Sequence, residues 1–154
     1  MKVHAIEQEQ WLPLTLKEGW DFFSSPRNLE EMTPPELGFR IVSLPSETLY
    51  EGEIIEYAVK AFPGIWIPWI SEITSLKEGE SFVDDQISGP FRFWHHRHSF
   101  EEKDGGVLVR DHIHYAVGFW FFGEIARHLV VKGQLEKMFE HRRVTLEKKF
   151  GKAI

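Results

Sequence analysis

The spacing of hydrophobic and polar residues changes three times along the chain, between the period of strands and that of helices. Residues 2–12 alternate as a strand does, and the run ends at Pro13. Thr15 and Glu18 have the spacing of a capping box, in which each side chain accepts a hydrogen bond from the other residue's backbone N–H. Apolar residues then recur at helical spacing up to Phe23. The sequence therefore predicts a strand, a proline break and a helix.

A second, shorter helix is expected directly afterwards. Ser25 is a favourable N-cap residue, and Pro26 suits the first position of a helix, where its missing N–H costs nothing. We expect this helix to end near Met32, before the run of residues 33–35, Thr-Pro-Pro, stops it.

From residue 39 onward the hydrophobic period becomes that of strands. Six runs separated by Pro, Gly and Glu-Gly turns have this pattern: 39–44, 52–62, 65–76, 81–88, 91–100 and 107–117. The connections between them are too short for the crossovers that parallel strands need. Together with residues 2–12, they predict about seven antiparallel strands.

The last element is a long amphipathic helix, predicted from about Phe122 to Phe150, where no proline intervenes. Its length would be about 40 Å. The apolar stripe consists of Val131, Leu135, Met138, Phe139, Leu146 and Phe150. Gly133 inside this helix predicts a bend or a close approach. Arg142 in the stripe predicts either a side chain that extends outward to solvent or a buried cation with an anionic partner.

Composition narrows the classes of function. The chain has 154 residues, of which 42% are apolar, so we expect one domain over residues 1–154. A net charge of −6 disfavours general nucleic-acid or anionic-membrane binding. The absence of cysteine excludes disulfides and thiol nucleophiles. With no run typical of a secretion signal or a membrane span, we expect a cytoplasmic monomer or homodimer.

The chemistry concentrates in a predicted hairpin, residues 89–115, which holds five of the eight histidines. Side chains two apart on a strand share a face. One face carries Trp94, His96, His98, Phe100, Val109, Asp111, Ile113 and Tyr115. The other carries His95, Arg97, Ser99, Arg110, His112 and His114.

Two His-x-His pairs, 96/98 and 112/114, raise the question of a metal site. Zinc or iron needs three or four ligands, each at about 2.0–2.2 Å. Strand alternation places the two pairs on opposite faces, so they cannot share an ion. His96, His98 and Glu102 resemble the start of a cupin metal motif, but the long C-terminal helix does not fit that fold. Nucleophile-elbow, phosphate-loop and dinucleotide motifs are absent, so we predict neither a metal nor another cofactor.

The order of elements is similar to that of the START-like helix-grip superfamily, the SRPBCC group. The stretches that carry the resemblance are 13–23, 82–86 with Gly89-Pro90, 94–100, 104–106 and 109–111. They resemble small bacterial members of the polyketide cyclase and lipid-transport branch. The resemblance implies an α+β helix-grip fold, in which a curved antiparallel sheet of about seven strands wraps around the C-terminal helix. It also implies an internal cavity for a hydrophobic or aromatic small molecule.

The resemblance and the strand faces together predict a set of ligand-binding residues. They are Trp69, Phe82, Asp84, Gln86, Trp94, His96, His98, Phe100, Asp111, Tyr115, Met138 and Arg142. His96, His98, Asp111 and Tyr115 are also candidates for acid–base catalysis, because burial and a neighbouring charge shift the pKa of an imidazole in opposite directions. The alternative is a hydrogen-bonded network that only fixes strand pairing.

Three functions follow from these residues. The first is binding or carriage of a lipid-like or polyketide-like molecule without catalysis, which we favour. The second is a cyclase or dehydratase, in which His96 or His98 is the base, Asp111 orients it, and Tyr115 or Arg142 stabilises an enolate. The third is a ligand-sensing module whose outer histidine face contacts a partner protein.

Two aromatic segments, 62–69 and 118–123, are expected either to cap the core or meet a second copy, or to rim the cavity entrance. In segment 118–123, relatives often have a proline-glycine turn.

Overall fold

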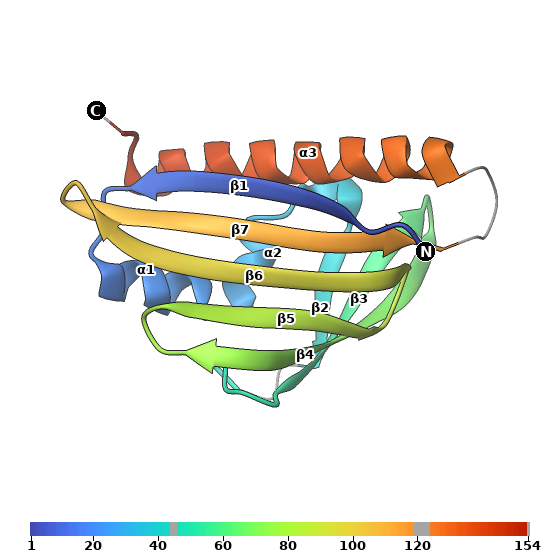
Figure 1. The fold of residues 1–154 in the computed structure, drawn as a ribbon, viewed down its shortest axis with the longest axis horizontal. Helices are drawn as coiled ribbons and strands as arrows, with labels where there is room; N and C mark the ends of the chain where they lie inside the picture. Colours follow the sequence, from blue (N-terminus) through green and yellow to red (C-terminus); the bar gives the residue numbers. More distant parts are fainter. Residues whose placement is uncertain (44–45, 119–123, 154) are drawn as a thin grey trace.

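The computed structural model describes residues 1–43, 46–118 and 124–153, and its strands form one antiparallel sheet (Figure 1). The strands are β1 (His4–Leu12), β2 (Phe39–Ser43), β3 (Ile54–Phe62), β4 (Ile65–Lys77), β5 (Ser81–Ser88), β6 (Phe91–Lys103) and β7 (Gly106–Val117). Their order across the sheet is β1-β7-β6-β5-β4-β3-β2. The predicted seven strands and their antiparallel pairing are confirmed. Leu44, the predicted end of β2, lies outside the described residues.

Two short helices and one long helix complete the fold. They are α1 (Leu16–Phe23), α2 (Arg27–Glu31) and α3 (Glu124–Phe150), and a 3-10 turn, η1 (Pro35–Leu37), follows α2. Both halves of the predicted capping box are present at the start of α1. Glu18 N donates to Thr15 Oγ1 at 3.2 Å, and Thr15 N donates to Glu18 Oε2 at 2.8 Å.

The start of α2 differs from the prediction by one residue. Pro26 has helical backbone angles but is the N-cap, and the helix begins at Arg27 with no side-chain hydrogen bond to its cap. Ser25 therefore contributes no side-chain cap here. The side-chain amide of Asn28 instead donates to the backbone oxygen of Phe22, which ties α2 back to α1.

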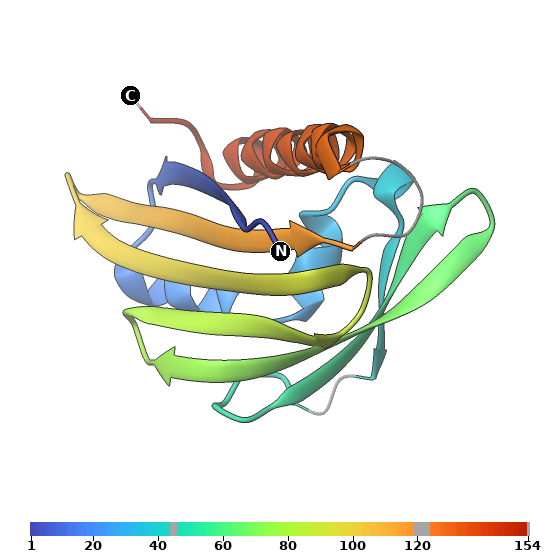
Figure 2. The ribbon, with the colours of Figure 1, turned by 45° about the vertical axis from the view of Figure 1, so that its right-hand side comes forward.

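The sheet curves strongly, and α3 runs along β1 and β7 on its concave side (Figures 1 and 2). The helices α1 and α2 lie near the same side, below β6 in Figure 1. This is the helix-grip arrangement expected from the order of elements. Phe122, the predicted first residue of the long helix, lies outside the described residues. Among the described helices, none is long and apolar enough to cross a membrane.

The buried apolar residues form two clusters on this concave side. The first includes Trp20 and Phe23 of α1, packed on β6 and β7 with Leu146 of α3. The second consists of Trp94, Ile113, Tyr115, Leu135 and Phe139, from β6, β7 and the preceding turns of α3. In β6, β7 and α3, charged or imidazole side chains lie between the residues of the first cluster and those of the second.

Gly133 makes no close approach to another described element. Among the described residues, a Cβ atom built at Gly133 would meet no heavy atom within 4 Å outside its own stretch of helix. The close contact expected at this glycine is therefore wrong. Gly106, at the start of β7, is a tight position, since a Cβ there would lie 2.4 Å from the Leu12 backbone oxygen.

Candidate functional site

Strand alternation places His96 and His98 together on the concave face of β6. Each residue is 7% exposed, whereas their neighbours His95 and Arg97 point to the opposite, outer face. On β7, Asp111 is 5% exposed and shares the concave face. The predicted face assignment of the hairpin is thus confirmed.

The register of three strands brings a second carboxylate to the same place. Asp84 of β5 is directly opposite His96, and His98 is directly opposite Asp111. Because directly opposed residues in an antiparallel pair have their side chains on the same side of the sheet, all four functional groups converge. We call Asp84, His96, His98 and Asp111 the polar tetrad.

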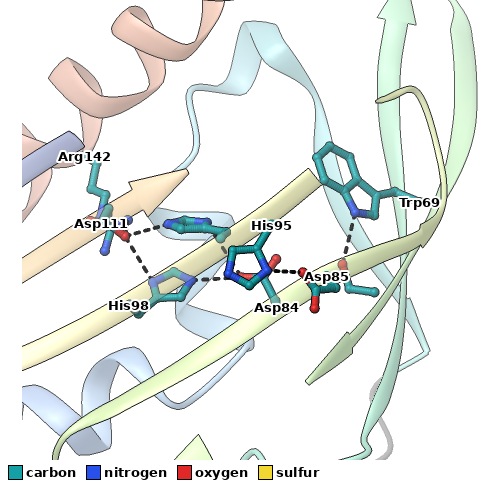
Figure 3. Close-up of polar contacts among 9 residues, drawn as sticks. Trp69, Asp84, Asp85, His95, His98, Asp111 and Arg142 are labelled. Carbon is teal, nitrogen blue, oxygen red and sulfur yellow. Dashed lines mark hydrogen bonds and ion pairs between the residues drawn. The ribbon is translucent and has the colours of Figure 1, made fainter. Parts of the chain in front are cut away.

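Each imidazole of the polar tetrad lies close to both carboxylates. Figure 3 shows His98 between Asp84 and Asp111. His98 Nε2 is 2.9 Å from Asp84 Oδ2, and its Nδ1 is 3.0 Å from Asp111 Oδ1. His96 Nε2 is 2.8 Å from Asp111 Oδ1, and its Nδ1 is 3.6 Å from Asp84 Oδ2. The His98 Nδ1 contact lacks hydrogen-bond geometry and acts as an ion pair.

Arg142 of α3 contacts the polar tetrad from the side of the helix. Its Nη1 donates to Asp111 Oδ1 at 3.1 Å, and the guanidinium lies 5.0 Å from the Phe23 ring centre. The residue is 6% exposed. Of the two predictions for Arg142, extension to solvent is therefore wrong, and the sheet supplies the anionic partner.

The pKa values of the two imidazoles are shifted in opposite directions. Burial lowers the pKa of His96, and the neighbouring charge of His98 acts in the same direction, which outweighs the two carboxylates. Burial alone would also lower the pKa of His98, but its contacts with Asp111 and Asp84 raise it above the ordinary value. The pair therefore binds one proton much more readily than two.

Both carboxylates of the polar tetrad are held ionised. Burial alone would raise the pKa of Asp111, but the charge of Arg142, with the contacts from His96 and His98, holds it well below its usual range. For Asp84, burial is likewise outweighed, chiefly by the hydrogen bond from His98, so its pKa is lowered. The site therefore combines two negative charges with one fixed positive charge.

Stacked and edge-on rings hold the imidazoles in place. The Phe82 ring stacks on His98 with ring centres 4.2 Å apart, and the Trp94 ring meets His96 edge-on at 6.0 Å. His96 and His98 are themselves only 3.8 Å apart. Both imidazoles are thus oriented by neighbours on every side.

The other predicted site residues divide between the two apolar clusters. Phe82 and Phe100 belong to the first, where they pack on Trp20. Trp69, Trp94, Tyr115 and Met138 lie in or against the second. Tyr115 is fully buried there, two residues beyond the one opposite His96, so it is not part of the polar tetrad.

Gln86 has a local structural role. Its side-chain nitrogen donates to the Phe91 backbone oxygen at 2.7 Å, and its side-chain oxygen accepts from the Phe91 backbone N–H at 3.2 Å. These bonds close the turn between β5 and β6. The amide is therefore engaged at the turn rather than at the polar tetrad.

Tyr57 of β3 is a site residue that the sequence analysis missed. It is 8% exposed. Burial, and then the negative charge of Asp84, raise the pKa of its phenol. The available signal was its position in an alternating strand, but β4 lies between β3 and β5, so no local pattern relates Tyr57 to Asp84.

The outer face of the hairpin carries a second set of histidines. The rings of His112 and His114 are 4.3 Å apart, and His95 lies 6.3 Å from His114 across the strand pair. His95 Nδ1 is also 2.6 Å from Asp85 Oδ1. These residues cannot reach the polar tetrad, because the sheet itself lies between them.

A small cavity lies beside Arg142. It has a volume of about 20 Å³ and is lined in part by Gln8, Asp111 and Phe139. This volume fits one water molecule. The larger ligand cavity remains a prediction, and residues 119–123, predicted to rim it, lie outside the described residues.

Comparisons with known proteins place the fold. No family model and no curated protein matches the sequence. Protein Ms6760 from Mycobacterium smegmatis has a similar structure, with a TM-score of 0.65, 18% identity, and coverage of 96% of this chain and 95% of that one. For Ara h 8.0201 the TM-score is 0.59 at 16% identity, covering 96% and 99% of the two chains.

A third similar structure is the di-domain ARO/CYC protein BexL from the BE-7585A biosynthetic pathway. Its TM-score is 0.71 at 13% identity, and the match covers 99% of this chain and 51% of that one. Identities this low establish the fold alone. The chain has the helix-grip fold, as its sequence predicted.

Proposed function

We propose that this protein binds a hydrophobic or aromatic small molecule between the sheet and the first half of α3, and that residues 1–154 form one ligand-binding domain. The ligand's apolar part would contact the second apolar cluster, and its polar end would face the polar tetrad. The fold neighbours support a small-molecule ligand, since two of them are ARO/CYC proteins of biosynthetic pathways.

The observation that carries the proposal is the change from aromatic to ionisable side chains along one concave face. Trp69, Phe91 and Trp94 meet one another with ring centres 4.8–5.5 Å apart. The next inward residue of β6 on this face is His96. Ligand sites typically combine apolar walls with a few convergent polar groups, and this face has both.

Trp69 and Phe91 are only partly buried, although large aromatic side chains usually gain free energy by full burial. They pack against the second cluster together with Val131 and Met138 of α3, which are also partly buried. A bound apolar molecule would cover these surfaces.

Native mass spectrometry of freshly purified protein tests the proposal first, because a co-purifying molecule identifies the ligand class. Binding of a fluorescent fatty-acid probe then tests the location. We expect Trp69→Leu to weaken probe binding about fivefold, since an aromatic contact is worth about 1 kcal/mol beyond its area. Phe93→Leu, on the outer face of β6, is the matched control and should leave affinity unchanged. Equal affinity of Trp69→Leu and the wild type would contradict the location.

A cyclase or dehydratase is the second candidate function, favoured by the position of His98 between two carboxylates. A buried imidazole that holds one proton is suited to exchange it with a bound ketone. In this case His98→Ala would abolish conversion of a polyketide-like ketone but retain its binding. His112→Ala on the outer face is the control. Conversion that survives His98→Ala would exclude this assignment.

A further inference from the structure

We propose that Asp84, His96 and His98 form a binding site for one divalent transition-metal ion of the zinc type. Among the described residues, these three bring one ligand atom each to within 4.8 Å of one another. Two imidazole nitrogens and one carboxylate oxygen are a common ligand set for such ions. The inference does not depend on the identity of the small molecule.

The spacing of the three ligand atoms suits a single ion. Ligands at about 2.0–2.2 Å from a metal are separated from one another by roughly 3.0–3.5 Å in tetrahedral or octahedral geometry. Asp84 Oδ2 lies 2.9 Å from His98 Nε2 and 3.6 Å from His96 Nδ1. These two separations are close to the required range, and all three ligand atoms lie within 4.8 Å of one another.

Asp111 orients both imidazoles toward the proposed ion. Its Oδ1 lies 2.8 Å from His96 Nε2 and 3.0 Å from His98 Nδ1, which are the two nitrogens that face away from Asp84. Metal-binding histidines usually direct their other nitrogen to a carboxylate, which fixes the tautomer and the ring orientation. Arg142 in turn holds the same oxygen of Asp111 at 3.1 Å.

The arrangement also leaves a lone pair of His96 directed at Asp84. With Nε2–H of His96 donated to Asp111, the lone pair of its Nδ1 faces the Asp84 carboxylate at 3.6 Å, beyond hydrogen-bond distance. A metal ion could therefore bind His96 Nδ1 without breaking the contact between His96 and Asp111.

Charge and access favour the same conclusion. In their ordinary charge states at neutral pH, the two carboxylates and the one guanidinium give the group a net charge of −1 when both imidazoles are neutral, so a cation would be attracted to it. The side chain of Asp84 is 22% exposed and both imidazoles are 9% exposed, so solvent reaches the group chiefly at Asp84. An open position is the feature that distinguishes catalytic or ligand-binding metal sites from closed structural ones.

The sequence analysis predicted no metal because it sought the missing ligands in the pair His112 and His114. Those two residues are on the outer face, as predicted, and cannot take part. The third ligand is instead Asp84, whose position opposite His96 depends on the register of β5. Nitrogen ligands favour zinc, cobalt, nickel or iron over magnesium and calcium, which prefer oxygen.

Isothermal titration of metal-free protein with zinc chloride tests the proposal. We expect one zinc ion per chain and a raised melting temperature, because binding to the folded state alone stabilises it. Asp84→Asn keeps the side-chain shape but removes the charge, and should weaken zinc binding at least about tenfold. The matched control, His112→Gln with His114→Gln, removes two exposed histidines and should retain the site.

Two further results complete the test. X-ray absorption of the zinc-loaded wild type should show two imidazole ligands, whether or not the Asp84→Asn variant folds. Magnesium chloride at the same concentration should not raise the melting temperature. Zinc binding that is absent, that is lost only in the outer-face variant, or that shows fewer than two imidazoles would overturn the proposal.

Discussion

The Arg142 guanidinium of α3 donates a hydrogen bond to the Asp111 carboxylate of β7 at 3.1 Å, although the two side chains are only 7% and 6% exposed. Removing one partner of a buried ion pair leaves the other charge uncompensated in a medium that solvates it poorly. Asp111 also contacts both imidazoles. This ion pair therefore links the attachment of α3 to the geometry of the polar tetrad.

Arg142→Met should lower the free energy of unfolding by about 3–5 kcal/mol, because it strands the Asp111 charge. Urea denaturation followed by circular dichroism measures the change. Arg143→Met is the control, since Arg143 is the next residue and its guanidinium donates to the Glu9 backbone oxygen at an exposed position. It should cost less than about 1 kcal/mol. A similar loss in both variants would refute a special role for the buried pair.

Gly133→Ala should stabilise the protein by about 0.5–1 kcal/mol, because alanine has the higher helix propensity and the new methyl group meets nothing within 4 Å. The same substitution at Gly106 should destabilise it, since a Cβ there would lie 2.4 Å from the Leu12 backbone oxygen. Thermal and urea unfolding of the two variants would show shifts of opposite sign. A loss of stability in Gly133→Ala would mean that the glycine is needed for another reason.

Thr15→Ala should cost about 1 kcal/mol, because it removes the hydroxyl that accepts from the Glu18 N–H. Thr15→Ser keeps that oxygen and should retain most of the stability. Urea midpoints of the two variants make the comparison. If alanine and serine behave alike, the capping box contributes nothing measurable.

His114 should titrate below the ordinary histidine pKa of about 6.5. Burial lowers its pKa first, and the charges of His112 and His95 lower it further, against a small opposing effect of Glu7. The unfolded chain therefore takes up this proton at higher pH than the folded chain. The contribution of His114 to stability is complete above the unfolded pKa, and it is lost as the pH falls from that value through the lower pKa of the folded state.

NMR titration of the imidazole signals tests this directly. In His112→Gln, the pKa of His114 should rise toward the ordinary value, because one repelling charge is gone. A pKa of His114 at or above that value in the wild type, or one unaffected by His112→Gln, would contradict the predicted repulsion.

Local patterns were sufficient to predict the elements of this fold. Capping at Thr15, proline at residue 13 and the period-two alternation of the strands act over a few residues, so the sequence displays them directly. Alternation also sorted the hairpin histidines correctly, because strand geometry permits only two faces. The one-residue error at Pro26 reflects a proline that has helical angles without belonging to the helix.

The residues of the site are brought together by strand register and helix packing, which no short stretch of the sequence reveals. The proximity of Asp84 to His96 is set by the register between β5 and β6, and a slip of one residue would have placed Asp85 there instead. The electrostatic influence of Asp84 on Tyr57 depends on the curvature of the whole sheet. The partner of Arg142 depends on how α3 docks on β7, which the apolar stripe fixes only in part.

The layer of charged groups between the two apolar clusters also separates the residues that pack α1 on the sheet from the residues proposed to contact a ligand. Trp20 and Phe23 pack on one side of it, while Phe91 and Leu135 pack on the other. Substitutions that enlarge or reshape the Leu135 side need not disturb the packing of α1. If the proposed ligand binds there, its specificity could change through mutation or engineering while the packing of α1 on the sheet stays the same.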